Sequence, residues 1–221
     1  APPAAPLAAV LVDRRGAHRW GRVTVVDPYL GTVVHRLAGR SASFRGSLAH
    51  LAAAGIPVVV GTPEQLRKKL PREMKQRSML AMAVSLPGRR RRGDEPGRVP
   101  LRAVLVVIDL PLLREVYDSA GVLHALENDV AVTLAHEISG HALGWVEAQD
   151  AFEGCLDPGY PEILSDSTAR GCAVERENRV RREIGVVERP SYLYLPLSSG
   201  QSWEALDRTH LERRKKKRRG H

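Results

Sequence analysis

The sequence predicts an α+β fold, in which a small mixed or antiparallel sheet packs on two long helices. Up to about residue 110, short apolar runs bounded by Gly and Pro, which are typical of strands, alternate with helix-like segments. From about 112 to 184 the pattern is mainly helical. The chain has 221 residues, 43% of them hydrophobic, which is enough for one good core. We therefore expect one domain over 21–206, between a Pro/Ala-rich linker or extension (1–20) and a basic tail (207–221).

The predicted strands lie in the first half of the chain. Residues 22–26 have strand character, and 32–37 could be their partner because DPYLG between them has turn chemistry. Further strands are predicted at 56–60, 79–86 and 101–109. The stretch 87–100 is rich in Gly, Pro and Arg, which indicates a loop.

Four of the predicted helices are marked by end signals. The segment 43–54 precedes Gly55, and a helix to about Leu70 starts at Thr62-Pro63, with Gln65 completing a capping box. In the second half, 129–144 is the strongest helix, with Asn128 or Asp129 as its cap. The last runs over about 166–184 and ends at Gly185.

The helix at 129–144 carries a constellation with metal-binding chemistry, His136-Glu137-Ile138-Ser139-Gly140-His141. In the zincin motif two His lie four residues apart, so both imidazoles leave the same helix face. Here the spacing is five, which on an ideal helix leaves the two side chains about 140° apart. One extra residue can be absorbed as a π-bulge, and Gly140 tolerates such distortion. The alternative is a regular helix that carries His and Glu by accident.

This stretch resembles the HExxGH motif of the dipeptidyl peptidase III family, zinc peptidases with the same one-residue insertion. The resemblance covers that motif. It implies that His136 and His141 bind Zn²⁺, that Glu137 activates water, and that a Glu on a later helix is the third ligand.

A second resemblance is to small zinc metallopeptidase domains of bacterial effectors and polymorphic toxins. Those domains place an AHE…HA helix before a segment like ENxxRRExG, followed by Arg, Pro and Tyr. The matching residues here are 135–142, then 177–185, then Arg189-Pro190 and Tyr192. The resemblance implies a zincin-like fold and a chain that is secreted or delivered into a target cell as part of a larger protein.

A catalytic zinc needs three protein ligands and an open position for water. Glu177 is the preferred third ligand because it heads the ENxxRRE segment; Glu175, Glu183 and Asp166 remain alternatives. Glu137 is the expected general base. Tyr192 or Tyr194 is a candidate donor to the oxyanion. An extended protein or peptide substrate could pair with the strand at 79–86 or at 101–109.

The net charge of +9 is concentrated at one end of the chain. RRKKKRR carries seven of these charges, so the rest has a net charge of +2. The run could bind an anionic partner such as nucleic acid, or be a solvated end. The competing function is therefore a non-catalytic nucleic-acid or partner-binding module that uses Arg213, Arg214, Lys215, Lys216, Lys217, Arg218 and Arg219.

Two further observations limit the function. Cys155 and Cys172 are too few for a disulfide framework or a thiolate zinc finger, and the sequence leaves open whether they pair. No apolar stretch is long enough to span a membrane.

Overall fold

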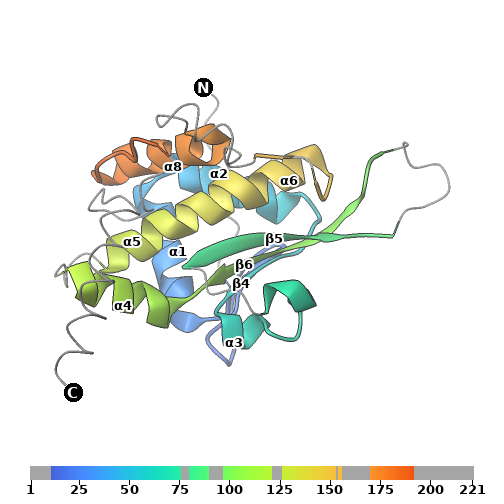
Figure 1. Cartoon of the computed structure of the whole chain (residues 1–221), viewed down its shortest axis with the longest axis horizontal. Helices are drawn as coiled ribbons and strands as arrows, with labels where there is room; N and C mark the ends of the chain where they lie inside the picture. The colour runs from blue at the N-terminus through green and yellow to red at the C-terminus, as the bar shows by residue number, and fades with distance from the viewer. Residues whose placement is uncertain are drawn as a thin grey trace, which may run out of the picture.

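The protein is described by a computed structural model that covers residues 11–75, 80–89, 97–120, 126–152, 154–155 and 170–191. Its centre is a six-stranded mixed sheet with helices on both faces (Figure 1). The strand order is β1-β2-β3-β4-β6-β5. The strands are β1 (Leu11–Val12), β2 (His18–Trp20), β3 (Val23–Val25), β4 (Val58–Gly61), β5 (Ala81–Pro87) and β6 (Leu101–Ile108).

Strand direction changes across the sheet. β3, β4 and β6 are parallel, whereas β5 runs antiparallel to β6 and stands at the end of the sheet. β1 and β2 extend the other end as an antiparallel pair. They lie within the segment predicted as a linker or extension, so the sheet begins at residue 11. The predicted α+β class is confirmed, with a mixed sheet.

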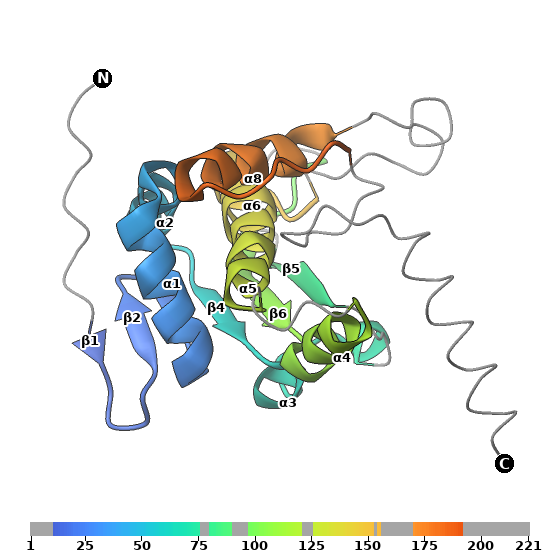
Figure 2. The same cartoon turned by 90° about the vertical axis from the view of Figure 1, so that its left-hand side faces the viewer.

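Most helices cover one face of the sheet (Figure 2). They are α1 (Pro28–Arg40), α2 (Ala42–Ala53), α4 (Leu110–Ala120), α5 (Leu126–Ala135), the π-helix η2 (His136–Ala142), α6 (Leu143–Ala148) and α8 (Gly171–Ile184). The short helices α3 (Pro63–Leu66) and η1 (Arg72–Met74) lie after β4, and α3 covers the opposite face. Alternation along β5 divides its side chains between the two apolar clusters: Ala81 and Ala83 face the larger, and Val84 and Leu86 the smaller.

One predicted element is wrong: 32–37 is not a strand but part of α1. The Asp27 carboxylate accepts a hydrogen bond from the backbone N–H of Leu30 at 3.0 Å, and Pro28 occupies the first turn. Asp followed by Pro therefore starts a helix here rather than a turn. Leu30, Val33 and Leu37 are buried at helical spacing, which stabilises this choice.

Other helix predictions are confirmed, with shifted ends. α2 covers the predicted segment, and the Thr62/Gln65 capping box is present, although α3 ends at Leu66. α8 begins at Gly171, and Gly185 follows it with a positive φ of 75°. The motif helix begins at Leu126, so neither Asn128 nor Asp129 is its N-cap. Asp129 is fully buried within the helix. Among the described residues, no helix has the length and apolar character needed to cross a membrane.

Candidate metal centre

The motif helix contains the wide turn that the His spacing predicts. α5, η2 and α6 follow one another without a break, and residues His136–Ala142 are π-helical. At its end, the backbone N–H of Leu143 donates to the carbonyl of Ile138, five residues back. A π-turn places residues five apart one above the other. The rings of His136 and His141 are accordingly 4.9 Å apart between centroids and nearly perpendicular, so the predicted convergence is confirmed.

Gly140 has a packing role that the sequence did not indicate. A Cβ built on it would lie 2.8 Å from the Cβ of Ala173 on α8, closer than real Cβ atoms approach other atoms. The glycine therefore lets α8 cross directly over the π-turn. This crossing brings α8 and the carboxylate of Glu177 to the side of His136.

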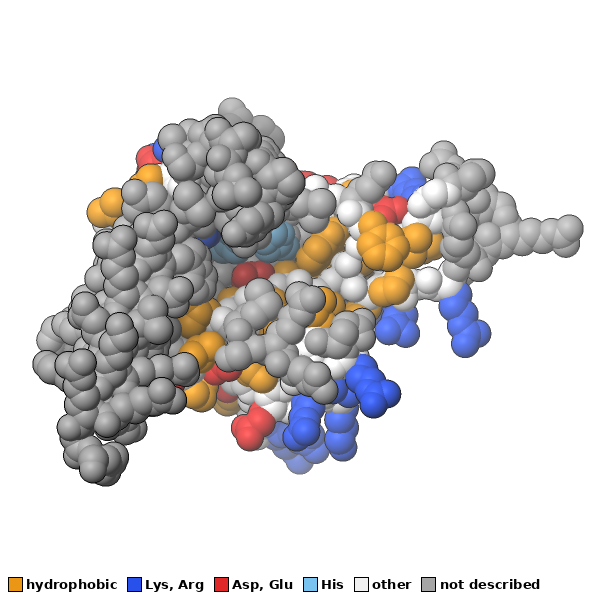
Figure 3. Space-filling view, in the orientation of Figure 1, with side chains coloured by type: hydrophobic (Ala, Val, Ile, Leu, Met, Phe, Trp, Pro, Cys, Tyr) orange, Lys and Arg blue, Asp and Glu red, His pale blue; other side chains and the backbone are white. Residues whose placement is uncertain are grey.

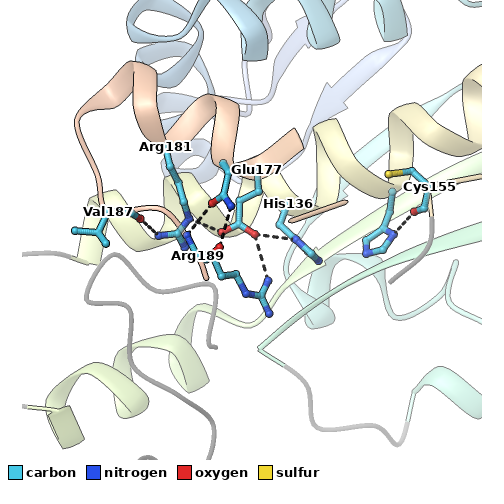
Figure 4. A network of polar contacts seen from close by, with 8 residues as sticks. His136, Cys155, Glu177, Arg181, Val187 and Arg189 are labelled. Atoms are coloured by element: carbon cyan, nitrogen blue, oxygen red, sulfur yellow. Dashed lines mark hydrogen bonds and ion pairs between the residues drawn. The ribbon is translucent and has the colours of Figure 1, made fainter. Parts of the chain in front are cut away.

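His136 is held by Glu177 from α8. Its Nδ1 lies 3.0 Å from Glu177 Oε2, and both side chains are buried (Figure 4). The other carboxylate oxygen, Oε1, accepts from Nε of Arg181 at 2.5 Å. A terminal nitrogen of Arg189 donates to Oε2 at 3.2 Å. The two carboxylate oxygens of Glu177 thus contact three side chains between them: Oε2 contacts His136 and Arg189, and Oε1 contacts Arg181.

The surroundings of Glu177 keep it ionised. Burial by itself raises the pKa of this carboxyl group, but the hydrogen bond to His136 and the charges of His136, Arg181 and Arg189 outweigh it. Together they lower the pKa of Glu177 to about 2. A buried carboxylate that stays charged at every pH well above its pKa of about 2 can orient an imidazole throughout that pH range.

The two arginines are themselves fixed by backbone contacts. The Asn178 amide donates to the carbonyl of Arg189 at 2.8 Å and accepts from its backbone N–H at 2.7 Å. Arg181 donates to the carbonyl of Val187 at 2.8 Å. Asn178, Arg181 and Arg189 were not among the site residues predicted from the sequence. The available signal was the ENxxRRE segment with its following Arg-Pro, which contains all three.

His141 is held from the other side by the chain that follows α6. Its Nδ1 lies 2.9 Å from the backbone carbonyl of Cys155. Trp145, one turn further along the helix, stacks on the ring with a centroid distance of 5.8 Å. Trp145 thus packs beside the motif. The contact of His141 with Cys155 was not predicted, because no sequence pattern indicates which backbone carbonyl will accept a hydrogen bond from a distant side chain.

The two cysteines pair. Cys155 and Cys172 form a disulfide with their Cα atoms 5.3 Å apart, which settles the question that the sequence left open. Cys172 is the second residue of α8, so the bridge connects the segment after α6 to the start of the helix that carries Glu177.

Part of the site is visible from outside (Figure 3): His side chains lie recessed, with an acidic side chain beside them and apolar surface next to it. Glu137 is buried between the two His in the same π-turn.

Two of the alternative ligands lie elsewhere. Glu183 accepts hydrogen bonds from the hydroxyls of Ser41 and Ser43 at the start of α2. Glu175 is exposed, on the solvent side of α8. Asp166, Tyr192, Tyr194 and the tail at 213–219 lie outside the described residues.

The two imidazoles of the site meet part of what a zinc ion requires from its ligands. Each imidazole has an acceptor on Nδ1, one a carboxylate and one a carbonyl, which is how metal-binding His are usually oriented; in such an arrangement Nε2 would be the nitrogen that coordinates a metal ion. Within the described segments, no group of three or more His, Cys, Asp or Glu is arranged to hold a metal ion. A third ligand is therefore needed in addition to the two imidazoles.

Comparison of the chain with protein-family models, with curated proteins and with solved structures finds no match. The function of this centre must accordingly be argued from its residues.

Proposed function

We propose that the chain is a zinc-dependent peptidase with a zincin-like site on the η2 turn. The observation that carries the proposal is the convergence of His136 and His141 through a π-turn, with Nδ1 of each ring held by an acceptor from another segment. A His pair placed by accident on a helix would need neither the distorted turn nor the two matched acceptors.

His136, His141 and Glu137 each have a separate role in the proposed hydrolysis. His136 and His141 would hold the ion, which polarises the scissile carbonyl and makes bound water acidic. Glu137 takes a proton from the attacking water as the new C–O bond forms. It then gives the proton to the amine nitrogen as the C–N bond breaks. Burial of His136, Glu137 and His141 limits access of bulk water to these groups.

That Glu177 is the third zinc ligand stays a prediction. Its contacts favour a different role for this residue, that of orienting His136. Its oxygens already face Nδ1 of His136 and two arginines, so it resembles the carboxylate that orients a metal-bound imidazole. In this arrangement the third ligand comes from another residue, and Asp166 is the remaining candidate among those named from the sequence.

The sheet limits where a peptide substrate can pair. β6 has β4 and β5 on its two sides, so it cannot accept a further strand. β5 pairs only with β6 among the described residues, and η2 packs against it. We propose that an extended peptide adds to β5 with its scissile bond over the π-turn. Such a domain would suit a bacterial effector or toxin that acts on a protein.

The test is metal analysis and peptide hydrolysis on the purified chain. Wild type is expected to hold stoichiometric zinc that is lost in His141→Ala. Glu137→Gln is expected to keep the zinc and to lose activity by a factor of about 10²–10⁴. Glu147→Gln is the matched control, because Glu147 lies on α6 in a partly exposed ion pair with Arg176 and should leave both unchanged.

Two outcomes would reject the proposal. The first is wild-type turnover in Glu137→Gln, which would remove its assigned role. The second is a metal-free wild-type protein whose nucleic-acid affinity disappears when residues 213–219 are deleted. That result would favour the binding-module function instead.

A further inference from the structure

Cys155 is connected to the candidate metal centre in two ways. Its backbone carbonyl accepts the hydrogen bond from Nδ1 of His141 (Figure 4). Its sulfur is bonded to Cys172 at the start of α8. A single residue thus links the ring of one proposed ligand to the helix that carries Glu177, the partner of the other.

Both glycines of the motif helix lie against this linkage. A Cβ on Gly144 would be 2.4 Å from the backbone N of Cys155, and as close to its Cβ. A Cβ on Gly140 would meet Ala173, the neighbour of Cys172. The segment with Cys155 can therefore reach His141 only because Gly144 lacks a side chain, and α8 can cross the π-turn beside Cys172 only because Gly140 lacks one.

The carbonyl of Cys155 is not fixed by secondary structure. Cys155 belongs to no helix or strand, so no backbone ladder determines where its carbonyl points. The covalent bond to α8 supplies that restraint. An acceptor on Nδ1 fixes the tautomer and direction of an imidazole, and loss of such a partner typically weakens metal binding about 10–100-fold.

We infer that the Cys155–Cys172 disulfide is a positioning element for His141, and that its reduction weakens zinc binding at this centre. The inference rests on the proposed function. It makes the site dependent on redox conditions: assembled in an oxidising compartment, and loosened where thiols are kept reduced.

Reduction is chemically accessible at one end of the bridge. Cys172 is exposed, whereas Cys155 is buried. A thiolate of a dithiol reductant attacks the sulfur of Cys172, and Cys155 leaves as a thiolate that takes up a proton. The second thiol of the reductant then displaces Cys172, so two electrons pass to the protein and the reductant becomes a cyclic disulfide.

The first test uses the double variant Cys155→Ser/Cys172→Ser, which avoids thiols that would themselves bind zinc. Zinc affinity is measured by competition with a chromophoric chelator. A Kd at least about 10-fold weaker than that of wild type is expected. Thr62→Ala is the control: it removes the cap of α3 on the other face of the sheet, which destabilises the fold away from the site, and should leave the Kd unchanged.

The second test needs no metal. Long-range ¹H–¹⁵N correlations on the zinc-free protein should show His141 as a single Nδ1–H tautomer while the disulfide is intact. A mixture of tautomers is expected after reduction with a dithiol. Gly144→Ala should produce the same change with the disulfide in place, because its methyl displaces Cys155. Gly46→Ala on α2, with nothing within 4 Å of the added methyl, should not.

The results separate this inference from the proposed function. An unchanged tautomer after reduction, or an unchanged zinc Kd in the double variant, overturns the positioning role. A wild-type protein that binds no zinc overturns the metal site, and the tautomer comparison still decides what the disulfide does.

Discussion

Nδ1 of His136 lies 3.0 Å from Oε2 of Glu177, although 41 residues separate the two in the sequence. The contact joins the π-turn of the motif helix to the middle of α8, and both side chains are buried, with 6% of His136 and none of Glu177 exposed. It brings a negative charge into the core, where two buried arginines compensate it. The stability of the fold and the geometry of the candidate site therefore depend on the same group of side chains.

Replacing Arg181 by Met should destabilise the fold strongly. The guanidinium is fully buried against Glu177, so its removal leaves a buried charge with less compensation; a cost of about 3–5 kcal/mol is expected. Arg182→Met is the control on the same helix, since its ion pair with Glu188 is largely exposed and worth at most about 1 kcal/mol. Urea denaturation with the disulfide intact measures both. Equal losses in the two variants would contradict the buried network.

The pKa of Glu177 predicts a loss of stability in acid. Its pKa is lowered to about 2 in the fold, below the ordinary value of 4.5, so the unfolded chain binds the proton more readily. The contribution is complete above pH 4.5 and is lost as the pH falls from 4.5 toward 2. It amounts to on the order of 3 kcal/mol.

Denaturation curves at a series of pH values check this prediction. The free energy of unfolding of wild type should fall more steeply through that window than that of Glu177→Gln, which has no proton to bind at this position. Parallel curves for the two proteins would show that Glu177 is not ionised in the way its surroundings require.

The role of Glu177 in the proposed metal site can be separated from its role in folding. If it orients His136, Glu177→Gln should still bind zinc, with an affinity lower by about 10–100-fold. If it is a ligand, stoichiometric zinc should be lost. Glu175→Gln, an exposed neighbour on α8, is expected to bind zinc as wild type does. Loss of metal in Glu175→Gln would instead make that residue the ligand.

Alanine at the two motif glycines should destabilise the fold, and more so at Gly144. Its added methyl would lie 2.4 Å from backbone and side-chain atoms of Cys155, against 2.8 Å from Ala173 for Gly140. Costs of about 1–3 kcal/mol are typical of such overpacking. Gly46→Ala should be neutral or stabilising by up to about 1 kcal/mol, because the methyl meets nothing and alanine favours a helix. Thermal unfolding of the three variants ranks them.

Local patterns were enough for much of the fold. The Thr62/Gln65 capping box, the end of α8 at Gly185 and the strands β5 and β6 all depend on residues close in the chain. Such signals arise from hydrogen bonds and periodicity within a few residues, which the sequence contains directly. The failure at 32–37 was also local: Asp27-Pro28 fits a turn and a helix start equally, and burial of one face of α1 decided between them.

The sequence by itself determined that His136 and His141 could meet only across a widened turn. Their five-residue spacing is one residue longer than the four-residue spacing that puts two side chains on the same face of an α-helix. Tertiary structure alone decided what surrounds them. It directed Glu177 to His136, Glu183 to Ser41 and Ser43, and paired Cys155 with Cys172. The contacts of Glu177 and of Cys155 depend on how closely α8 approaches the π-turn at Gly140 and how closely the Cys155 segment approaches α6 at Gly144, distances that no pattern of neighbouring residues specifies.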